Sequence, residues 1–288
     1  MLLSLMNKYK RPRICAGAPG SVHSVSSLHA AVNPFGNSFS VFSVTARRDT
    51  LLLNNPKGKY MPITTCVFDA YGTLFDVTAA ARQAASEPDF AALKSDWPQV
   101  AEYWRQKQLS YSWLRAVTRA HDDFWQVTQD GLDWALEKTG HDGDPTLRER
   151  LLALYWELQA YPEVPAMLQT LKDAGLNTAI LSNGSPAMLK GAVESAGIGG
   201  TLDVLLSVET VGVFKPDARV YDLVGQQFGC TKDEVLFVSS NGWDAGAATG
   251  YGFTTAWVNR NSDPVDRLPW TPVHVLKQLD GIPQLAGV

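Results

Sequence analysis

The sequence predicts an α/β fold, with a parallel-sheet core and an inserted helical cap. Three observations lead to this prediction. Short apolar runs rich in β-branched residues alternate with amphipathic segments, which is the pattern of a parallel sheet with helices on both faces. Clusters of polar residues follow these runs at the point where each run ends. A stretch of about ninety residues after the first run holds helical patterns and no strand pattern.

Five apolar runs are predicted strands of a Rossmann-like parallel sheet. Each is short, as expected for a strand buried on both faces. They cover residues 64–68, 178–181, 204–206, 235–238 and 254–258. Core helices are expected over residues 164–174, from Pro186 to about Gly197, and from Pro216 to Gly229. Gly175 ends the first of these helices, whereas Ser185 followed by Pro186 begins the second, as is usual at helix boundaries.

The stretch without strands is predicted to be an all-helical lid, or cap. Amphipathic patterns cover residues 96–119, 122–138 and 145–159, and most of their tryptophans are interpreted as helix-packing residues. The predicted organisation is a core domain over residues 61–75 and 161–288, with the cap subdomain over residues 76–160.

Residues 1–60 differ from the rest of the chain and are predicted to be an N-terminal extension that is disordered or not native. They hold eight basic residues against one acid, Asp49, whereas the remainder is acidic. Two interpretations are open: a transit-type leader, which has a similar composition, or a protein that begins at Met61. Residues 35–44 have the pattern of a strand, to which no role is assigned.

Composition narrows the class of protein. With 288 residues, 45% of them hydrophobic, and a net charge of -4, the chain is not of a disordered, fibrous or disulfide-rich class. Cys15, Cys66 and Cys230 show no C-x-x-C spacing, which favours a reducing, cytoplasmic location. No apolar stretch is long enough to span a membrane. Because the excess of bases is confined to the N-terminal arm, the main body is not expected to bind nucleic acid.

Polar residues collect where four predicted strands end. In an open α/β sheet, ligands bind beyond the carboxyl ends of the strands, so these residues are expected to meet. Singly, each is as well explained by a turn or a helix cap. The clusters are Asp69 and Thr73, then Ser182 and Asn183, then Lys215, and finally Ser239, Asn241 and Asp244.

These clusters resemble the motifs of the haloacid dehalogenase superfamily. The matching segments are Asp69-Ala70-Tyr71-Gly72-Thr73, Leu181-Ser182-Asn183-Gly184, Lys215-Pro216-Asp217 and Ser239-Ser240-Asn241-Gly242-Trp243-Asp244. The resemblance covers residues 63 to about 259. Within the superfamily, residues 104–109 and Val258-Asn259-Arg260 make the chain most similar to the 2-haloacid dehalogenases specific for the L, or (S), isomer.

The phosphatases of this superfamily use magnesium and a second Asp two residues after the nucleophile, and this chain departs from both features. Tyr71 stands in place of the second Asp, and Ser240 takes the place of one acid after the fourth strand. Asp69 and Asp244 alone are a poor site for magnesium, which prefers several oxygen ligands. A halide leaves without a proton. We therefore expect no cofactor and no metal.

The resemblance implies a hydrolase of carbon–halide bonds that works by covalent catalysis. Asp69 attacks C2 of a short L-2-haloacid, halide leaves, and water hydrolyses the aspartyl ester to give the D-2-hydroxyacid with inversion. Without the family match, Arg105 would be interpreted as a solvated arginine on a helix surface; with it, Arg105 and Asn183 are expected to receive the halide.

The other site residues have predicted roles as well. Lys215 balances the charges of Asp69 and Asp244, and Asp244 acts as base or charge partner for hydrolysis. The residues expected to orient Asp69 or the water are Thr73, Ser239 and Asn241. The residues expected to bind or surround the substrate are Ala70, Tyr71, Gln106, Leu109, Phe124, Ser182, Asn183, Tyr221 and Trp243. Tyr221 is expected to contact Lys215. Ala70 is smaller than the leucine often found beside the nucleophile in this subfamily, and its effect on the size of the pocket is left open.

Two rival functions are open at this point. One is a magnesium-dependent phosphatase of the same superfamily; the other is a non-catalytic binding protein on the same fold. The predicted partners are a small 2-haloacid, water and the halide product. A homodimer is suggested by the resemblance alone.

Overall fold

The computed structural model describes residues 62–288. The predicted extension over residues 1–60, with its strand pattern at 35–44 and the candidate start at Met61, lies outside the described residues. Within residues 62–288, no helix has both the length and the hydropathy needed to cross a membrane.

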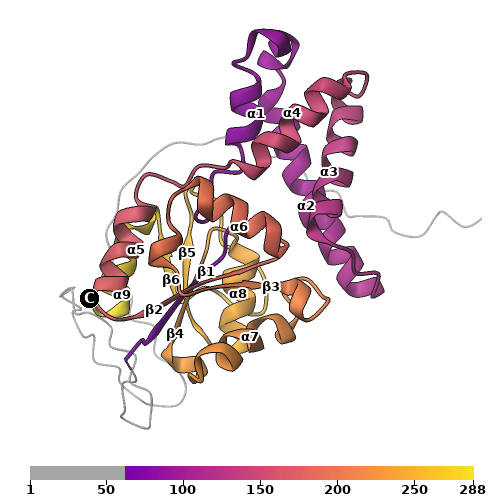
Figure 1. Cartoon of the computed structure of the whole chain (residues 1–288). Helices are drawn as coiled ribbons and strands as arrows, with labels where there is room; N and C mark the ends of the chain where they lie inside the picture. The colour runs from indigo at the N-terminus through magenta and orange to yellow at the C-terminus, as the bar shows by residue number, and fades with distance from the viewer. Residues whose placement is uncertain (1–61) are drawn as a thin grey trace, which may run out of the picture. The chain divides into compact units, whose positions relative to one another are not determined.

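The core is a six-stranded parallel sheet in the order β3-β2-β1-β4-β5-β6. This confirms the predicted α/β class (Figure 1). The strands are β1 (Thr65–Phe68), β2 (Asn177–Ser182), β3 (Val204–Ser207), β4 (Val235–Ser239), β5 (Thr254–Val258) and β6 (His274–Leu276). Strand β1 is fully buried at the centre, which explains its unbroken apolar character.

The register of the central strands brings their carboxyl ends together. Phe68, the last residue of β1, pairs with Ile180 of β2 on one side and with Val238 of β4 on the other. The order of the strands reverses between β1 and β4, and such a reversal opens a crevice at the carboxyl edge of the sheet. The residue that follows Phe68 is Asp69, which therefore stands at this crevice.

Helices surround the sheet. Those of the core are α5 (Val164–Asp173), α6 (Pro186–Ser195), α7 (Ala218–Phe228), α8 (Gly242–Tyr251) and α9 (Ile282–Ala286). Short 3-10 segments lie at Pro88–Lys94 in the cap and, in the core, at Gly199–Thr201, Val208–Thr210, Lys232–Glu234 and Leu279–Gly281. Helix α7 begins two residues later than predicted, because Asp217 accepts the amide of Arg219 and forms the N-terminal cap.

The cap is inserted between β1 and α5 and is entirely helical. It contains α1 (Ala79–Ala84), α2 (Trp97–Thr118), α3 (Phe124–Thr139) and α4 (Pro145–Trp156). Two side chains of α2 hold the other helices. The indole of Trp104 donates to the Thr128 carbonyl of α3 over 2.8 Å. The amide of Gln108 donates to Thr128 Oγ1 and to Tyr155 OH of α4, each over 3.0 Å.

The sequence analysis did not predict four elements: α8, with ten residues, and the shorter α1, α9 and β6. Helix α1 has six residues, and β6 has three that alternate between half-buried and exposed positions at the edge of the sheet. Elements of this length carry too few residues for a periodic pattern to be recognised.

Candidate functional site

Asp69 is buried, only 7% exposed, and held by three donors. Thr73 Oγ1 and Asn241 Nδ2 both donate to Oδ2 over 3.0 Å, and Lys215 Nζ donates to Oδ1 over 3.2 Å. The two carboxylate oxygens thus differ, because Oδ2 takes two of the bonds and Oδ1 takes one. Oδ1 therefore keeps more lone-pair capacity for a further partner.

The turn after β1 places Thr73 beside Asp69. The carbonyl of Ala70 accepts the amides of Thr73, Leu74 and Phe75, which curls the chain back over the strand end. Gly72 has φ +87°, a conformation that a residue with a side chain rarely adopts. A β-carbon there would lie 3.1 Å from Ser240 Oγ, so both the backbone and the space favour glycine.

Lys215 lies between two carboxylates in the core. Its ammonium is 3.2 Å from Asp69 Oδ1 and 2.9 Å from Asp244 Oδ2, and its side chain is 1% exposed. Burial acts to lower the pKa of Lys215, but the attraction of Asp244 and Asp69 outweighs it and raises that pKa above its ordinary value. Lys215 is therefore a permanent cation at this site.

Asp244 is fully buried and receives a second donor besides Lys215. Tyr221 OH donates to Asp244 Oδ1 over 2.7 Å. Burial raises the pKa of Asp244; the Lys215 ammonium opposes the rise, the charge of Asp69 adds to it, and the bond from Tyr221 opposes it. The net result is a carboxylate with a pKa above its ordinary range, a property suited to accepting a proton.

The donor set of this site does not fit magnesium. The position between the two carboxylates is taken by the Lys215 ammonium, and the neighbouring positions hold Tyr71 and Ser240 in place of acids. Over residues 62–288, no group of three or more acidic, histidine or cysteine side chains is gathered as metal ligands would be. The positive charge that balances the Asp69 and Asp244 carboxylates comes from the Lys215 side chain.

The cap contributes Arg105 from α2. Its Nη2 donates to the Tyr71 carbonyl and to Asn241 Oδ1, each over 3.2 Å. Because Asn241 also donates to Asp69, one amide links the cap arginine to the carboxylate in the core. Arg105 is half-buried and faces the site, so its interpretation as a solvated surface residue is wrong.

The core and the cap together line a cavity of about 20 Å³, which has room for one water molecule. Its lining comes from both the core and the cap: Asp69, Tyr71, Arg105, Leu109, Phe124, Ser182, Asn183, Lys215, Asn241 and Trp243. Tyr71 packs against Tyr155 with ring centroids 5.4 Å apart, and its hydroxyl is buried without a hydrogen-bond partner. Burial holds the pKa of Tyr71 well above its ordinary value, so the phenol stays neutral.

Comparison with known proteins identifies the family. Residues 63–252 match the model of the haloacid dehalogenase-like hydrolases. The chain belongs to this family.

Among the proteins similar to this chain are several (S)-2-haloacid dehalogenases. The chain is 42% identical over 224 residues to (S)-2-haloacid dehalogenase 1 of Pseudomonas sp. (strain CBS-3), covering 78% of this chain and 96% of that protein. It is 40% identical to the (S)-2-haloacid dehalogenase of Pseudomonas sp. (strain YL), covering 76% and 92%. A solved L-2-haloacid dehalogenase from Xanthobacter autotrophicus with chloropropionic acid covalently bound matches with a TM-score of 0.70 at 36% identity, covering 78% and 98%.

Most residues that the sequence placed at this dehalogenase-like site lie at or next to the cavity, but three differ from prediction. Gln106 is exposed and donates to Glu102, because one helical step turns it away from Arg105. Ala70 is fully buried and lies outside the lining of the cavity. Tyr221 donates to Asp244, where a contact with Lys215 was expected.

Ser182, Ser239 and Asn183 all take part in holding the loops at the strand ends. Ser182 Oγ accepts the Gly184 amide and Ser239 Oγ accepts the Asn241 amide, each over 3.1 Å. Asn183 Oδ1 accepts the Lys215 amide over 2.9 Å. Ser182 and Asn183 also line the cavity, whereas Ser239 acts only through Asn241.

Two aromatic residues that the sequence analysis did not single out pack against residues of the cavity lining. Tyr155 of α4 packs on Tyr71, and Phe214 packs edge-on to Phe124 with centroids 5.9 Å apart. Their only sequence signal was an apolar helix or loop position, which does not reveal a partner.

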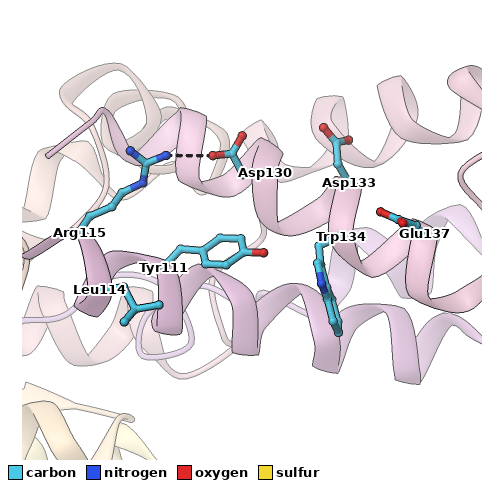
Figure 2. A pocket seen from close by; sticks show the side chains of 7 residues that line it. All are labelled: Tyr111, Leu114, Arg115, Asp130, Asp133, Trp134 and Glu137. Carbon is cyan, nitrogen blue, oxygen red and sulfur yellow. Dashed lines mark hydrogen bonds and ion pairs between the residues drawn. The ribbon is translucent and has the colours of Figure 1, made fainter. Parts of the chain in front are cut away.

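A larger hollow of about 460 Å³ lies elsewhere, between α2 and α3 of the cap. Figure 2 shows it with the ion pair between Arg115 and Asp130, whose closest atoms are 3.1 Å apart. It shares no lining residue with the cavity at Asp69; two of its three carboxylates, Asp133 and Glu137, are exposed to solvent, and the third, Asp130, is paired with Arg115. The chemistry is therefore assigned to the smaller cavity.

Proposed function

We propose that this chain is an (S)-2-haloacid dehalogenase, which hydrolyses short L-2-haloacids to D-2-hydroxyacids. One observation carries the proposal: a buried carboxylate, Asp69, is oriented by Thr73, Asn241 and Lys215 in a cavity closed by a cap arginine. The names of the relatives agree with it, since they act on (S)-2-haloacids and cover most of this chain.

The first step is displacement at C2. Asp69 Oδ1, the oxygen with the fewer bonds, attacks C2 from the side opposite the halogen. The new C–O bond forms as the C–halogen bond breaks, and the bonding pair leaves with the halide, which the Arg105 guanidinium stabilises. Exclusion of water by the cap strengthens the carboxylate as a nucleophile. One displacement inverts C2 and leaves an ester on Asp69.

The second step is hydrolysis of the ester. Water attacks the Asp69 carbonyl carbon while Asp244 accepts a proton from it. The ester C–O bond breaks on the Asp69 side, the product oxygen takes up a proton, and one proton is released to solvent overall. Lys215 and Tyr221 hold Asp244 in place during this step. The product is the D-2-hydroxyacid, and the carboxylate of Asp69 is restored.

The substrate carboxylate needs donors away from Arg105. We assign it to Ser182 and Asn183 at the end of β2, with main-chain amides near Tyr71. Leu109, Phe124 and Trp243 supply the apolar lining for the C2 substituent. Asn183 also lines the cavity, and we assign it a place beside Arg105 at the halide.

We further propose a homodimer, supported by two apolar side chains of α2, Leu114 and Val117, which are 60% and 82% exposed. A monomeric mass by light scattering for the wild-type chain would contradict it. We also propose a cytoplasmic location, because Cys66 and Cys230 are free thiols, as is usual in a reducing compartment.

The test of the function is a halide-release assay with short L- and D-2-haloacids, with and without excess chelator. We expect release from the L isomers only, a D-2-hydroxyacid product, and no effect of the chelator. Phosphate release from a phosphomonoester that depends on added magnesium, without halide release, would replace the proposal with the phosphatase.

A further inference from the structure

Arg260 lies two residues after the end of β5 and takes no part in the chemistry proposed above. It is half-buried, and its loop is closed by Asn259, whose side chain bonds to both the amide and the carbonyl of Asp263 over 2.8 Å. The position of Arg260 is thus fixed from the core side. Its guanidinium points to the place where the chain leaves the core for the cap and returns from it.

The two linkers of the cap lie side by side at this place. The Tyr161 amide donates to the Leu74 carbonyl over 2.9 Å, and the Asp76 amide donates to the Gln159 carbonyl over 3.1 Å. Phe75 and Ala160 form an antiparallel bridge between them. The cap therefore joins the core through one paired, two-stranded hinge.

Arg260 contacts both strands of the hinge. Its Nη2 donates to the Thr73 carbonyl on the outgoing linker over 3.3 Å. On the returning linker, its Nη1 pairs with Glu163 over 2.7 Å, and its guanidinium carbon lies 3.7 Å from the centre of the Tyr161 ring. A planar group with several donors makes all three contacts at once, which a lysine ammonium does not reproduce.

The contact of Arg260 with the outgoing linker is connected to the nucleophile through Thr73. Arg260 holds the carbonyl of Thr73, and the hydroxyl of the same residue donates to Asp69 and accepts the Ser240 amide. A movement of the Thr73 backbone would thus tilt the Asp69 carboxylate. A cap movement that admits substrate to the cavity at Asp69 would be absorbed at these two paired linkers.

We propose that Arg260 is a positioning residue for the dehalogenation reaction. It clamps the hinge to the core, so that Thr73 and Asp69 keep their alignment while the cap opens and closes. Its effect belongs to the displacement step and not to substrate binding. This inference rests on the proposed function, but the clamp itself is a property of the hinge and is tested separately.

The first test measures kinetics in Arg260→Gln, Arg260→Lys and Glu163→Gln, with the exposed Arg267→Gln as control. We expect Arg260→Gln to lower kcat and the first-turnover rate of halide release about 30-fold, with KM within about 3-fold, since only transition-state alignment is lost. Arg260→Lys and Glu163→Gln should fall between it and the wild type. In Arg260→Ala, added guanidinium should restore part of kcat. A folded Arg260→Gln variant with wild-type kcat, or with a change in KM alone, overturns the proposal.

The second test does not depend on activity. Hydrogen exchange of peptides covering residues 73–77 and 159–163 reports the hinge amides of Asp76 and Tyr161. We expect faster exchange there in Arg260→Gln, by about 10-fold, and no change in the sheet, because the hinge opens locally. Unchanged hinge exchange overturns the clamp even if the chain releases halide. Faster exchange in a chain whose wild type releases none supports the clamp and rejects the proposed function.

Discussion

At the scale of single residues, the site separates nucleophile from base by giving two aspartates different partners. Asp69 has three donors and lines the cavity, whereas Asp244 is fully buried behind it. Lys215 touches both and carries the charge that keeps them side by side. Two carboxylates in different surroundings are thereby suited to different tasks.

Replacement of Asp69 by Asn removes the attacking oxyanion and keeps the shape. We expect halide release to fall by more than about a thousandfold, or about 4 kcal/mol on the barrier. Halide assay and circular dichroism together check that activity is lost while the fold is kept. More than about a thousandth of wild-type turnover would argue against a covalent role for Asp69.

Replacement of Tyr221 by Phe should shift the pH profile of kcat. Asp244 must be ionised to accept a proton, so kcat falls as the pH drops through its pKa. That pKa lies above the ordinary value, and the bond from Tyr221 OH acts to lower it. Loss of this bond therefore raises the pKa further and moves the acid limb of kcat to higher pH.

The control for this shift is Tyr251→Phe. Tyr251 packs on Tyr221 with centroids 5.4 Å apart, but its hydroxyl bonds to Asp222 and not to Asp244. An acid limb that stays in place in Tyr221→Phe, or that moves equally in both variants, would mean that Asp244 does not set the profile.

At the scale of elements, α2 presents different faces to the site and to the cap. Arg105 reaches the cavity, while Trp104 and Gln108 anchor the helix to α3 and α4. Arg105→Lys keeps the charge but loses the planar donors that contact Tyr71 and Asn241 together. We expect turnover to fall sharply on both chloro and bromo substrates. Wild-type rates would show that Arg105 does not meet the halide.

Gln108→Met should destabilise the cap without changing the site directly. The amide is 1% exposed and serves Thr128 and Tyr155, so its loss leaves buried hydroxyls with fewer partners. We expect a loss of about 1–3 kcal/mol in the free energy of unfolding, measured in urea. Gln106→Met, two residues earlier and exposed, is the matched control and should change stability little. Equal effects of the two would contradict the anchoring role.

The sequence predicted elements better than contacts. The polar clusters were located correctly because the carboxyl ends of neighbouring parallel strands meet whatever the loops do. The exposure of Gln106 could not be predicted this way, because it depends on the rotation of α2 about its axis. The bond from Tyr221 to Asp244 could not be predicted either, because it joins two helices that are separated in the sequence. Strand β6 was missed because three residues at the edge of a sheet are too few to show a hydrophobic period.

At the scale of the whole molecule, the core and the cap supply different groups to the site. The core holds the nucleophile, the ammonium and the base, whereas the cap supplies Arg105 and an apolar lining from Leu109 and Phe124. No basic group capable of activating water lines the cap side of the cavity. This division predicts where water attacks the ester: at the Asp69 carbonyl carbon, next to Asp244, and not at C2.

Oxygen-18 water separates the possible routes in a single turnover with excess enzyme. Attack at the Asp69 carbonyl leaves the label on Asp69 and gives one net inversion. Attack at C2 of the ester inverts twice and gives retention. A mechanism in which Asp69 only activates water inverts once but puts the label into the product. We expect L substrate to give unlabelled D-hydroxyacid, and mass spectrometry to find the label in the Asp69 peptide. Label in a first-turnover D-hydroxyacid would reject the ester even if halide is released, because label with inversion is the outcome of direct attack by a water that Asp69 activates. Label in an L-hydroxyacid would keep the ester but place the attack of water at C2, on the side of the cavity lined by Arg105, Leu109 and Phe124.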